Sequence, residues 1–406
     1  MAATTGKASV PTMSLLVTGN LLGAGILALP VNLGPAGMIP AAAGIVLVWA
    51  IMLASAWILV GQDDLVQGDS GGLPSFFGAK MGPAAKWLAV AADLVVFYGV
   101  LTAYLTGTTT ILTNLFILPV SKPVATLAYF VIVAGLTGFG MSLLRRCNTV
   151  ILVCMGLTFS TMVAMTLGHV EPARALPMRW GFLPAAMPVA LTAFLFHNLI
   201  PTLCREIGDR AAVRRAVLYG SLIGLAMNLA WTGAVFCSLP MQGPESISLL
   251  WAYKANLPAT VPLSLLLDSK LFTNIGLIFA ILSMSAAFLA NGTALQDFLL
   301  DLTSTYLRTR SKILIWALAF LPPLLVSIFY PGIFLAAMNL VGGVGICLLF
   351  GVLPGFLLLR QATGPKRILA VALLVLFGAV LVFELGQELG LTNIHPDVEY
   401  WTQFVN

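Results

Sequence analysis

Long stretches without any charged residue dominate the chain. The residues between Lys7 and Asp63 carry no formal charge, and this stretch is too long for one membrane crossing because about 20 apolar residues span the hydrocarbon core. Gly34-Pro35-Ala36-Gly37 supplies a turn, so the pattern predicts one helix over 11–34 and another over 37–61. Further uncharged windows, each predicting one helix, are 94–121, 123–144, 147–170, 180–204, 216–244 and 271–296. Tyr330-Pro331-Gly332 splits the window 313–359 into two, and a last span covers 367–390, which makes eleven predicted transmembrane helices.

The composition supports a membrane protein and excludes a soluble one. Hydrophobic residues make up 59% of the chain, charged residues 9%, and the mean hydropathy is +1.00, whereas a soluble domain carries about 25% charge. The net charge of +5 comes without any basic run longer than two residues, so no nucleic-acid partner is expected. The five cysteines have no paired spacing, and therefore no metal site, disulfide framework or cofactor is expected either.

The distribution of Lys and Arg predicts the orientation in the membrane. If the N-terminus is cytoplasmic, fifteen of these residues fall on the inner side and only Lys122, Arg174, Arg179, Lys254 and Lys270 fall on the outer side. This bias follows the positive-inside rule. It predicts a multi-pass protein of the cell inner membrane with an extracytoplasmic C-terminus and the lipid bilayer as its surroundings. No cleavable signal peptide is expected.

Two of the predicted spans are interrupted in their middle. The first contains Gly19, Gly23, Gly25 and then Pro30, which are poor helix formers. In lipid, freed backbone groups are tolerated where they line a cavity or where neighbouring groups bond them, but small residues also allow close helix packing. Both interpretations remain open from the pattern alone.

The second interruption lies in the sixth span, where Pro201 removes the hydrogen bond to the carbonyl of His197. His197 is the only one of the three histidines at membrane depth. Such a residue is either a hydrogen-bonded packing residue or a functional group that changes charge near neutral pH. The only glycosylation triplet, Asn291-Gly292-Thr293, also falls at membrane depth and is expected to be unused.

Two interrupted helices, each opening a half of five helices, indicate a secondary transporter with its site at the membrane midplane. The halves would cover 11–170 and 180–360 in opposite orientations, with an extra helix at 367–390, all within one transmembrane domain over 1–406. A membrane enzyme would need clustered intramembrane histidines or paired carboxylates, which the sequence lacks, so no enzyme activity is expected. A channel would not require two opposed broken helices.

Four segments resemble one known family. The residues from Gly19 to Pro30 resemble the G-x-x-x-G-A-G-[IM]-L-A-[LM]-P segment of the hydroxy/aromatic amino acid permeases, which belong with the amino acid/auxin permeases in the APC superfamily. Phe194-x-Phe196-His197-x-x-Ile200-Pro201 is similar to the family's motif in helix 6. The weaker matches are Tyr98-(x5)-Tyr104-Leu105-Thr106-Gly107 and Leu295-x-Asp297-Phe298-Leu299-x-Asp301.

This resemblance implies the leucine-transporter-type fold, with two inverted five-helix repeats and one extra helix. It also implies import of a neutral amino acid, with an aromatic one favoured, driven by a cation gradient. The residues that it assigns to substrate binding are Asn20, Gly23, Ala24, Gly25 and Ile26 in the first break, Phe194, Phe196, His197 and Asn198 in the second, and Tyr98 and Thr102 beside them. An unwound helix N-terminus offers free N–H groups to a carboxylate.

The coupling ion is indicated by a departure from the family pattern in helix 8. Where sodium-coupled members offer adjacent hydroxyls, the alignment places Ala286-Ala287, and a methyl group cannot ligate a hard cation. The sequence therefore favours a proton over sodium. The coupling-ion candidates are Ser283 and Ser285, which could ligate sodium only if the register of the alignment shifts, together with Asp93 and His197. The alternative is a transporter of the same fold that carries small neutral amino acids or another amine, as a sodium symporter or an exchanger. Glu384 and Glu388 are expected on a solvated helix face.

Overall fold

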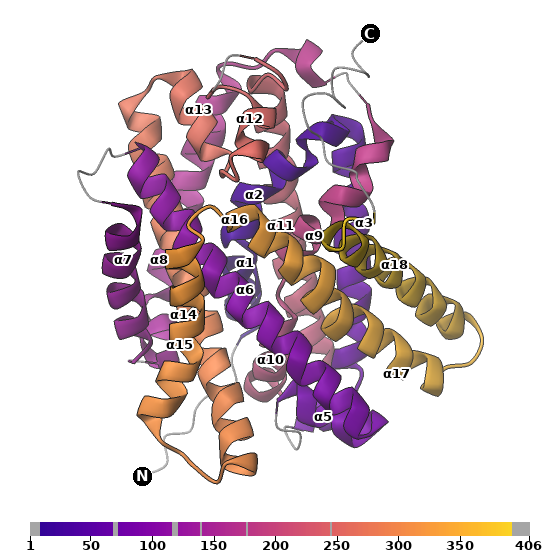
Figure 1. Cartoon of the computed structure of the whole chain (residues 1–406). Coiled ribbons are helices and arrows are strands. Elements are labelled where there is room, and N and C mark those ends of the chain that lie inside the picture. The colour runs from indigo at the N-terminus through magenta and orange to yellow at the C-terminus, as the bar shows by residue number, and fades with distance from the viewer. Residues whose placement is uncertain are drawn as a thin grey trace.

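Helices packed side by side make up the structure, a computed structural model that describes residues 9–67, 72–115, 121–138, 140–175, 178–243 and 246–391 (Figure 1). No strand occurs in these ranges. The long helices are α3 (Met38–Val60), α6 (Pro83–Leu115), α8 (Gly140–Leu167), α11 (Arg210–Ser238), α14 (Lys270–Tyr306), α15 (Lys312–Phe329) and α18 (Pro365–Glu388). The shorter α7 covers Lys122–Thr137. This supports the predicted helical membrane protein.

Three further runs of helix change geometry along their length. The first is α1 (Val10–Leu21) followed by α2 (Ala24–Leu33), the second is α9 (Leu183–Ala193), η4 (His197–Leu199) and α10 (Ile200–Ile207), and the third is α16 (Phe334–Leu340), the π-helix η5 (Val341–Val352) and α17 (Leu353–Gln361). Within the described ranges, nine helices are long and apolar enough to cross a membrane. The pair α1 and α2, bent by 51°, would be a tenth span.

Short helices that the hydrophobic pattern does not predict connect the spans. They are η1 (Gly34–Ala36), α4 (Asp63–Gln67), α5 (Leu73–Met81), η2 (Pro172–Ala175), α12 (Leu249–Lys254) and α13 (Thr260–Leu267). A further short helix, η3 (Trp180–Phe182), begins the span predicted over 180–204. The connection between α12 and α13 docks directly on the first broken helix, because the backbone N–H of Ala259 donates to the carbonyl of Leu27 at 3.1 Å. Their stability comes from packing on the spans, which a local hydropathy pattern does not record.

Close backbone contact between η5 and its neighbours holds the centre of the bundle. A Cβ atom at Gly342 would lie 1.7 Å from the carbonyl oxygen of Pro188 in α9, so no other residue fits there without separating the two helices. Beside it, a Cβ atom at Gly343 would lie 2.4 Å from Cγ of Glu384 in α18. Glycines along η5 therefore allow α9 and α18 to approach it, as small residues do at membrane helix interfaces.

The burial of Glu384 corrects one prediction. The sequence places this residue on a solvated face, but only 2% of it is exposed. The physical reason is its neighbour, because Gly343 has no side chain to keep the glutamate away from η5. Which face of α18 is buried depends on this helix pairing and not on the spacing of the two glutamates.

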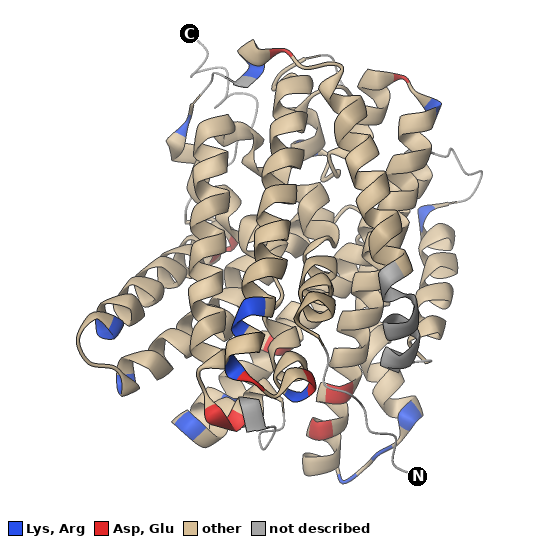
Figure 2. Cartoon of the chain, turned by 180° about the vertical axis from the view of Figure 1, so that it is seen from behind, with Lys and Arg blue, Asp and Glu red and all other residues tan. Residues whose placement is uncertain are grey.

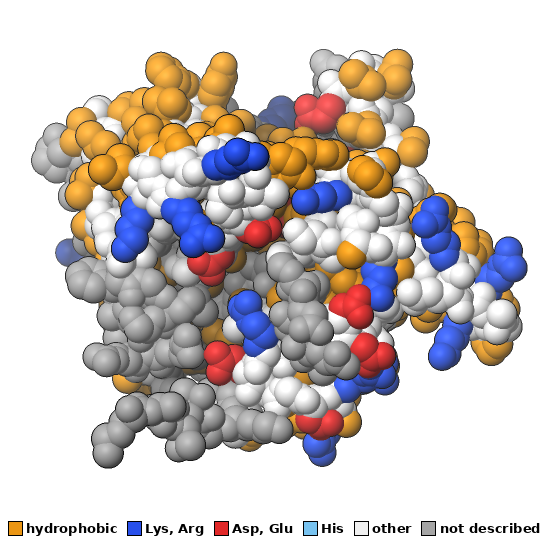
Figure 3. Space-filling model, turned by 90° about the horizontal axis from the view of Figure 1, so that it is seen from below, with side chains coloured by type: hydrophobic (Ala, Val, Ile, Leu, Met, Phe, Trp, Pro, Cys, Tyr) orange, Lys and Arg blue, Asp and Glu red, His pale blue; other side chains and the backbone are white. Residues whose placement is uncertain are grey.

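Basic residues gather at one end of the bundle, as Figure 2 and the view onto that end in Figure 3 show. We call this end the basic face. Its described residues belong to the helix ends and connections that meet there, and they include Lys80, Lys86, Arg205, Arg210, Arg214, Arg310, Lys312, Arg360 and Lys366. Two ion pairs organise it: Lys80 with Asp64 at 2.6 Å, and Arg210 with Asp63. They tie α4 to α5 and to the start of α11.

Candidate functional site

The first helix break lies at Gly23, whose backbone is extended (φ −69°, ψ −153°) and separates α1 from α2. A Cβ atom there would lie 3.3 Å from both the hydroxyl of Tyr104 in α6 and Cβ of Ala287 in α14. The next glycine, Gly25, faces a different helix, since a Cβ atom on it would lie 2.5 Å from Cα of Ala193 in α9. Both glycines therefore permit close approach, and Ala24, Gly25 and Ile26 are fully enclosed.

No side chain caps the first turn of α2, and that turn is buried. The first N–H groups of a helix have no partner inside the helix, and the helix dipole places a partial positive charge at the same end. This geometry suits an anion such as a carboxylate. The residues of the first break that the sequence predicts to bind substrate thus lie together around the N-terminus of α2.

Three asparagines join the first break to the second. Nδ2 of Asn20 in α1 donates to the carbonyl of Leu195 at 2.7 Å and to Oδ1 of Asn198 at 3.3 Å. Nδ2 of Asn198 in turn donates to Oδ1 of Asn291 in α14 at 2.7 Å. Buried side-chain amides need such partners because an unpaired polar group in an apolar interior is costly.

The chain of hydrogen bonds continues from α14 to α6. Nδ2 of Asn291 donates to the hydroxyl of Tyr104 at 3.4 Å and to the carbonyl of Ala287 at 2.9 Å. We call Asn20, Asn198, Asn291 and Tyr104 the asparagine network. It connects α1, η4, α14 and α6 at the point where the two breaks meet. Oδ1 of Asn20 is buried and has no partner in the part of the chain that the structure describes.

The sequence identified only part of this network. The sequence predicts substrate binding for Asn20 and Asn198, whereas Tyr104 occurs only within a family segment and Asn291 only within a glycosylation triplet. The signal that could have found Asn291 was its depth, because a carboxamide in the middle of an apolar span needs a polar partner.

His197 is fully buried and is held by contacts from α3 and η5. Its ring stacks between Phe196 at 4.5 Å and Phe350 at 4.8 Å between ring centroids. Nε2 lies 3.0 Å from the backbone carbonyl of Met52, and since a carbonyl only accepts, Nε2 carries the proton. Nδ1 is buried without a partner among the described residues. These contacts brace the interruption between α9 and α10.

The remaining predicted residues are distributed around the network. Phe194 ends α9 and is fully buried. Tyr98 points to α15, where its hydroxyl donates to the carbonyl of Leu318 at 2.8 Å, and Thr102 donates to the carbonyl of Tyr98 at 2.7 Å. The tyrosine of α6 that touches the break is therefore Tyr104, not Tyr98.

The coupling candidates of α14 lie apart from the break. Ser285 shares a hydrogen bond of 3.0 Å with Tyr129 in α7, and Ser283 donates to the carbonyl of Ala280 at 3.2 Å within its own helix. The residues that face α1 are instead Ala286 and Ala287.

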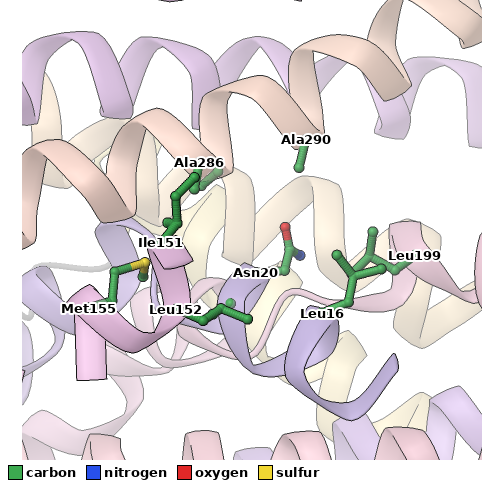
Figure 4. Close-up of a pocket in the computed structure, with 10 residues that line it drawn as sticks. Leu16, Asn20, Ile151, Leu152, Met155, Leu199, Ala286 and Ala290 are labelled. Atoms are coloured by element: carbon green, nitrogen blue, oxygen red, sulfur yellow. The ribbon is translucent and has the colours of Figure 1, made fainter. Parts of the chain in front are cut away.

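A cavity of about 20 Å³, the size of one water molecule, lies between α1, α8 and α14 (Figure 4). Its lining residues are Leu16, Gly19, Asn20, Ile151, Leu152, Met155, Leu199, Ala286, Ala287 and Ala290. Asn20, which points from α1 toward α14 in Figure 4, supplies the only polar side chain among them. A hard cation prefers several oxygen ligands, and this lining offers one side-chain oxygen.

A larger cavity of about 280 Å³ extends from the basic face to Asn198. It is lined by residues of α5, α6, α10 and α14, with Asp93, Arg205, Asp297 and Asp301 as its charged groups. Asp93 is only 5% exposed, and neither a hydrogen bond nor an ion pair of its carboxyl occurs within the described ranges. We call this cavity the acidic vestibule. It brings a buried carboxyl and the asparagine network into one continuous space.

Apolar helices around a buried polar network at two helix breaks define a multi-pass membrane protein with an internal site. The chain belongs to the tryptophan/tyrosine permease family, which matches residues 7–387. It is similar to tyrosine-specific transport system 1 of Haemophilus influenzae, with 26% identity over 81% of this chain and 82% of the relative. It is also similar to the tryptophan-specific transport protein of Pseudomonas aeruginosa (24% identity, 81% of each chain) and, over 48% of this chain and 49% of the relative, to the low affinity tryptophan permease of Escherichia coli (26% identity).

Proposed function

We propose that this protein imports a neutral aromatic amino acid by proton symport, as a secondary active transporter that works by alternating access. The observation that carries the proposal is the uncapped start of α2 beside the asparagine network, because it offers N–H groups to a carboxylate and amide groups to polar atoms in one enclosed place. The names of the relatives, which are tyrosine- and tryptophan-specific transporters, support an aromatic substrate.

The architecture that we propose is the leucine-transporter type, with two inverted repeats over 11–170 and 180–360 and an extra helix over 367–390. Supporting it, the two interrupted helices lie against each other and are joined by the bond between Asn20 and Asn198. Counting the bent pair as one span and the 16-residue apolar helix α7 as another brings the number of spans to eleven. The protein would carry its substrate chemically unchanged and would not be an enzyme.

In the proposed site, the backbone N–H groups of Gly23, Ala24, Gly25 and Ile26 receive the substrate carboxylate, and freed carbonyls hold its ammonium group. Phe194 and Phe196 supply an aromatic wall, and Asn198 supplies a polar contact. Tyr104 and Asn291 join this set because they touch Gly23 and Asn198 respectively. His197, which is stacked between two phenylalanines, is proposed to fix the second break.

Proton coupling is supported by the contrast between two cavities. The cavity beside Ala286 and Ala287 lacks the hydroxyl groups that sodium would want, whereas the acidic vestibule contains the buried carboxyl of Asp93. A buried carboxylate without a partner is costly and usually functional in a membrane. We therefore propose Asp93 as the coupling residue, facing Asp297 and Asp301 of α14 and Arg205 of α10 across the vestibule.

The orientation that fits these roles has the basic face in the cytoplasm of a cell with the protein in its inner membrane. The N-terminus would then be cytoplasmic and the C-terminus extracytoplasmic. Protons would be released from the acidic vestibule into the cytoplasm, together with the amino acid.

Uptake into proteoliposomes tests the proposal. With an acidic exterior, we expect the proteoliposomes to accumulate labelled tyrosine or labelled tryptophan, and each amino acid to inhibit uptake of the other. This accumulation should continue when potassium or choline replaces sodium. Proteoliposomes without a pH gradient serve as the control. A strict sodium requirement would favour the sodium-coupled alternative, competition by small neutral amino acids or amines alone would change the substrate class, and chemical conversion of the substrate would exclude a simple transporter.

A further inference from the structure

A second cavity that opens on the basic face has no part in the site described above. It measures about 640 Å³ and lies between the end of α3, the start of α11 and the hairpin formed by α17 and α18. In Figure 1 this hairpin tilts away from the rest of the bundle toward its turn. The lining residues are Ala54, Trp57, Ile58, Gly61, Gln62, Arg210, Arg214, Leu358, Gln361, Ala362, Lys366 and Leu369.

The lining changes from apolar to cationic toward the end of α3. Ala54, Trp57 and Ile58 belong to the last turns of α3, and Trp57 and Leu369 are 37% and 41% exposed. Beyond them lie the residues at the helix ends, where Gln62 and Gln361 exchange hydrogen bonds of 3.3 and 3.4 Å. Because the four helices all begin or end at this level, we expect the hydrocarbon of a bilayer to give way to lipid headgroups there.

Two of the three cations in the cavity are without a counter-ion. Arg210 pairs with Asp63, whereas Arg214 and Lys366 form no ion pair within the described residues. The guanidinium of Arg214 lies beside Gly61 at the end of α3, 3.7 Å from where a Cβ atom would be. No Asp or Glu belongs to the lining. The cavity therefore has an uncompensated positive charge next to an apolar wall.

We propose that this cavity binds an anionic glycerophospholipid of the leaflet on the basic face. The phosphate group would lie between Arg214 and Lys366, and an acyl chain would run along Trp57, Ile58 and Leu369. Basic pockets between transmembrane helices on the cytoplasmic side are suited to anionic headgroups. A free phosphate ion would satisfy the cations but leave the apolar wall uncovered, so the lipid matches the whole lining better.

Such a lipid would connect the hairpin to the bundle. Arg214 belongs to α11 and Lys366 to α18, so one headgroup would bridge two helices that are separated on this face by the cavity. Because α18 also packs on η5 through Glu384 and Gly343, the lipid would limit the tilt of the hairpin next to the site. Binding itself requires only that the protein is embedded in a bilayer, and it is independent of the proposed substrate and coupling ion.

Native mass spectrometry of the purified full-length protein with added phosphatidylglycerol tests this inference. We expect one phosphatidylglycerol to remain bound under conditions that remove phosphatidylcholine. The doubly substituted variant Arg214→Gln/Lys366→Gln should bind it about 25-fold more weakly, since each cation near an anionic headgroup contributes about fivefold in affinity. Arg310→Gln/Lys312→Gln is the matched control, because it removes the same charge from exposed positions of the same face.

The outcomes separate the possible ligands. Equal loss in both variants would show general surface attraction and overturn the site, as would equal retention of phosphatidylglycerol and phosphatidylcholine. Protection of the thermal transition by inorganic phosphate as strongly as by phosphatidylglycerol would replace the lipid with a soluble anion. If the variant that lacks Arg214 and Lys366 fails to fold, the single variants Arg214→Lys and Lys366→Arg, which keep the charge, should bind normally. A loss of binding in these charge-preserving variants would also contradict the proposal.

Discussion

At the scale of single residues, the site depends on amide groups that satisfy one another. Asn291 accepts a hydrogen bond from Asn198 and donates one to Tyr104, so it stands between the second break and α6. Removing one partner from a buried hydrogen bond leaves the other group unpaired, which costs about 1–3 kcal/mol. The energetic role of Asn291 can therefore be measured by truncation.

We predict that Asn291→Ala weakens amino acid binding about 10- to 100-fold, a range that corresponds to the cost of unpairing a buried amide. Equilibrium binding of labelled substrate to detergent-purified protein measures this. The matched control is Asn228→Ala in α11, a buried asparagine whose side-chain amide, among the residues that the structure describes, donates only to the carbonyl of Gly224 in its own helix. Unchanged affinity in Asn291→Ala, with the protein folded, would remove this residue from the site.

His197 leads to a prediction about coupling. Because its ring is enclosed by Phe196, Phe350 and the carbonyl of Met52, we expect His197→Gln to lower thermal stability by several degrees while pH-driven accumulation persists. Uptake under a proton gradient and counterflow exchange, measured on the same proteoliposomes, test this. Intact exchange with accumulation lost would identify His197 as the proton carrier and contradict the bracing role.

At the scale of helices, close packing of η5 on α9 sets the geometry around the second break. Pro188 lies inside α9, and Gly342 packs against the carbonyl oxygen of Pro188. Thr192, one turn later, donates both to the carbonyl of Pro188 at 3.1 Å and across to that of Met338 in α16 at 2.8 Å. Thus α9 is joined to α16 by a hydrogen bond and to η5 by backbone contact, and a change in its separation from them would move Phe194 as well.

We predict that Gly342→Ala destabilises the protein by about 1–3 kcal/mol, because extra atoms in a tightly packed interface force the backbone apart. Thermal unfolding in detergent, followed by intrinsic fluorescence, measures the effect. Gly378→Ala in α18 is the control, since a Cβ atom there meets nothing within 4 Å. Equal melting temperatures for the two variants would show that η5 can move away from α9 at no cost.

At the scale of the whole molecule, coupling requires that a proton site and a substrate site share one path. The acidic vestibule contains both Asp93 and Asn198, and Asn198 continues through the asparagine network to the break at Gly23. If Asp93 carries the proton, its charge state changes on the side from which substrate leaves. The vestibule would then connect coupling with release.

We predict that Asp93→Asn retains counterflow exchange but loses concentrative uptake, because the amide is neutral like a protonated carboxyl and cannot release a proton. The wild-type protein should accumulate substrate about tenfold per unit of pH gradient for one proton, since one pH unit corresponds to 1.36 kcal/mol. The variant should approach equal concentrations on both sides. Asp301→Asn, at an exposed position of the same vestibule, is the matched control and should accumulate normally. Full accumulation by Asp93→Asn would exclude Asp93 as the coupling residue.

The sequence by itself determined the membrane environment, the approximate spans and the places where two of them break. Lipid makes this possible, because each spanning segment must be apolar and must bond its own backbone, so both requirements are written locally along the chain. The predicted turn at Tyr330-Pro331-Gly332 follows the end of α15 at Phe329. Gly23 and Pro201 marked the two interruptions for the same local reason.

Only the tertiary structure decided which side chains meet. The bonds of Asn291 with Asn198 and Tyr104 depend on the rotation of each helix about its axis, which is set by contacts between residues far apart in the chain. The same long-range packing buried Glu384 against Gly343, turned Tyr98 toward α15, and opened the acidic vestibule beside Asp93. Lipid and the protein interior are both apolar, so the hydropathy of a transmembrane helix is similar on every face. The face that points into the protein is therefore determined by the neighbouring helices.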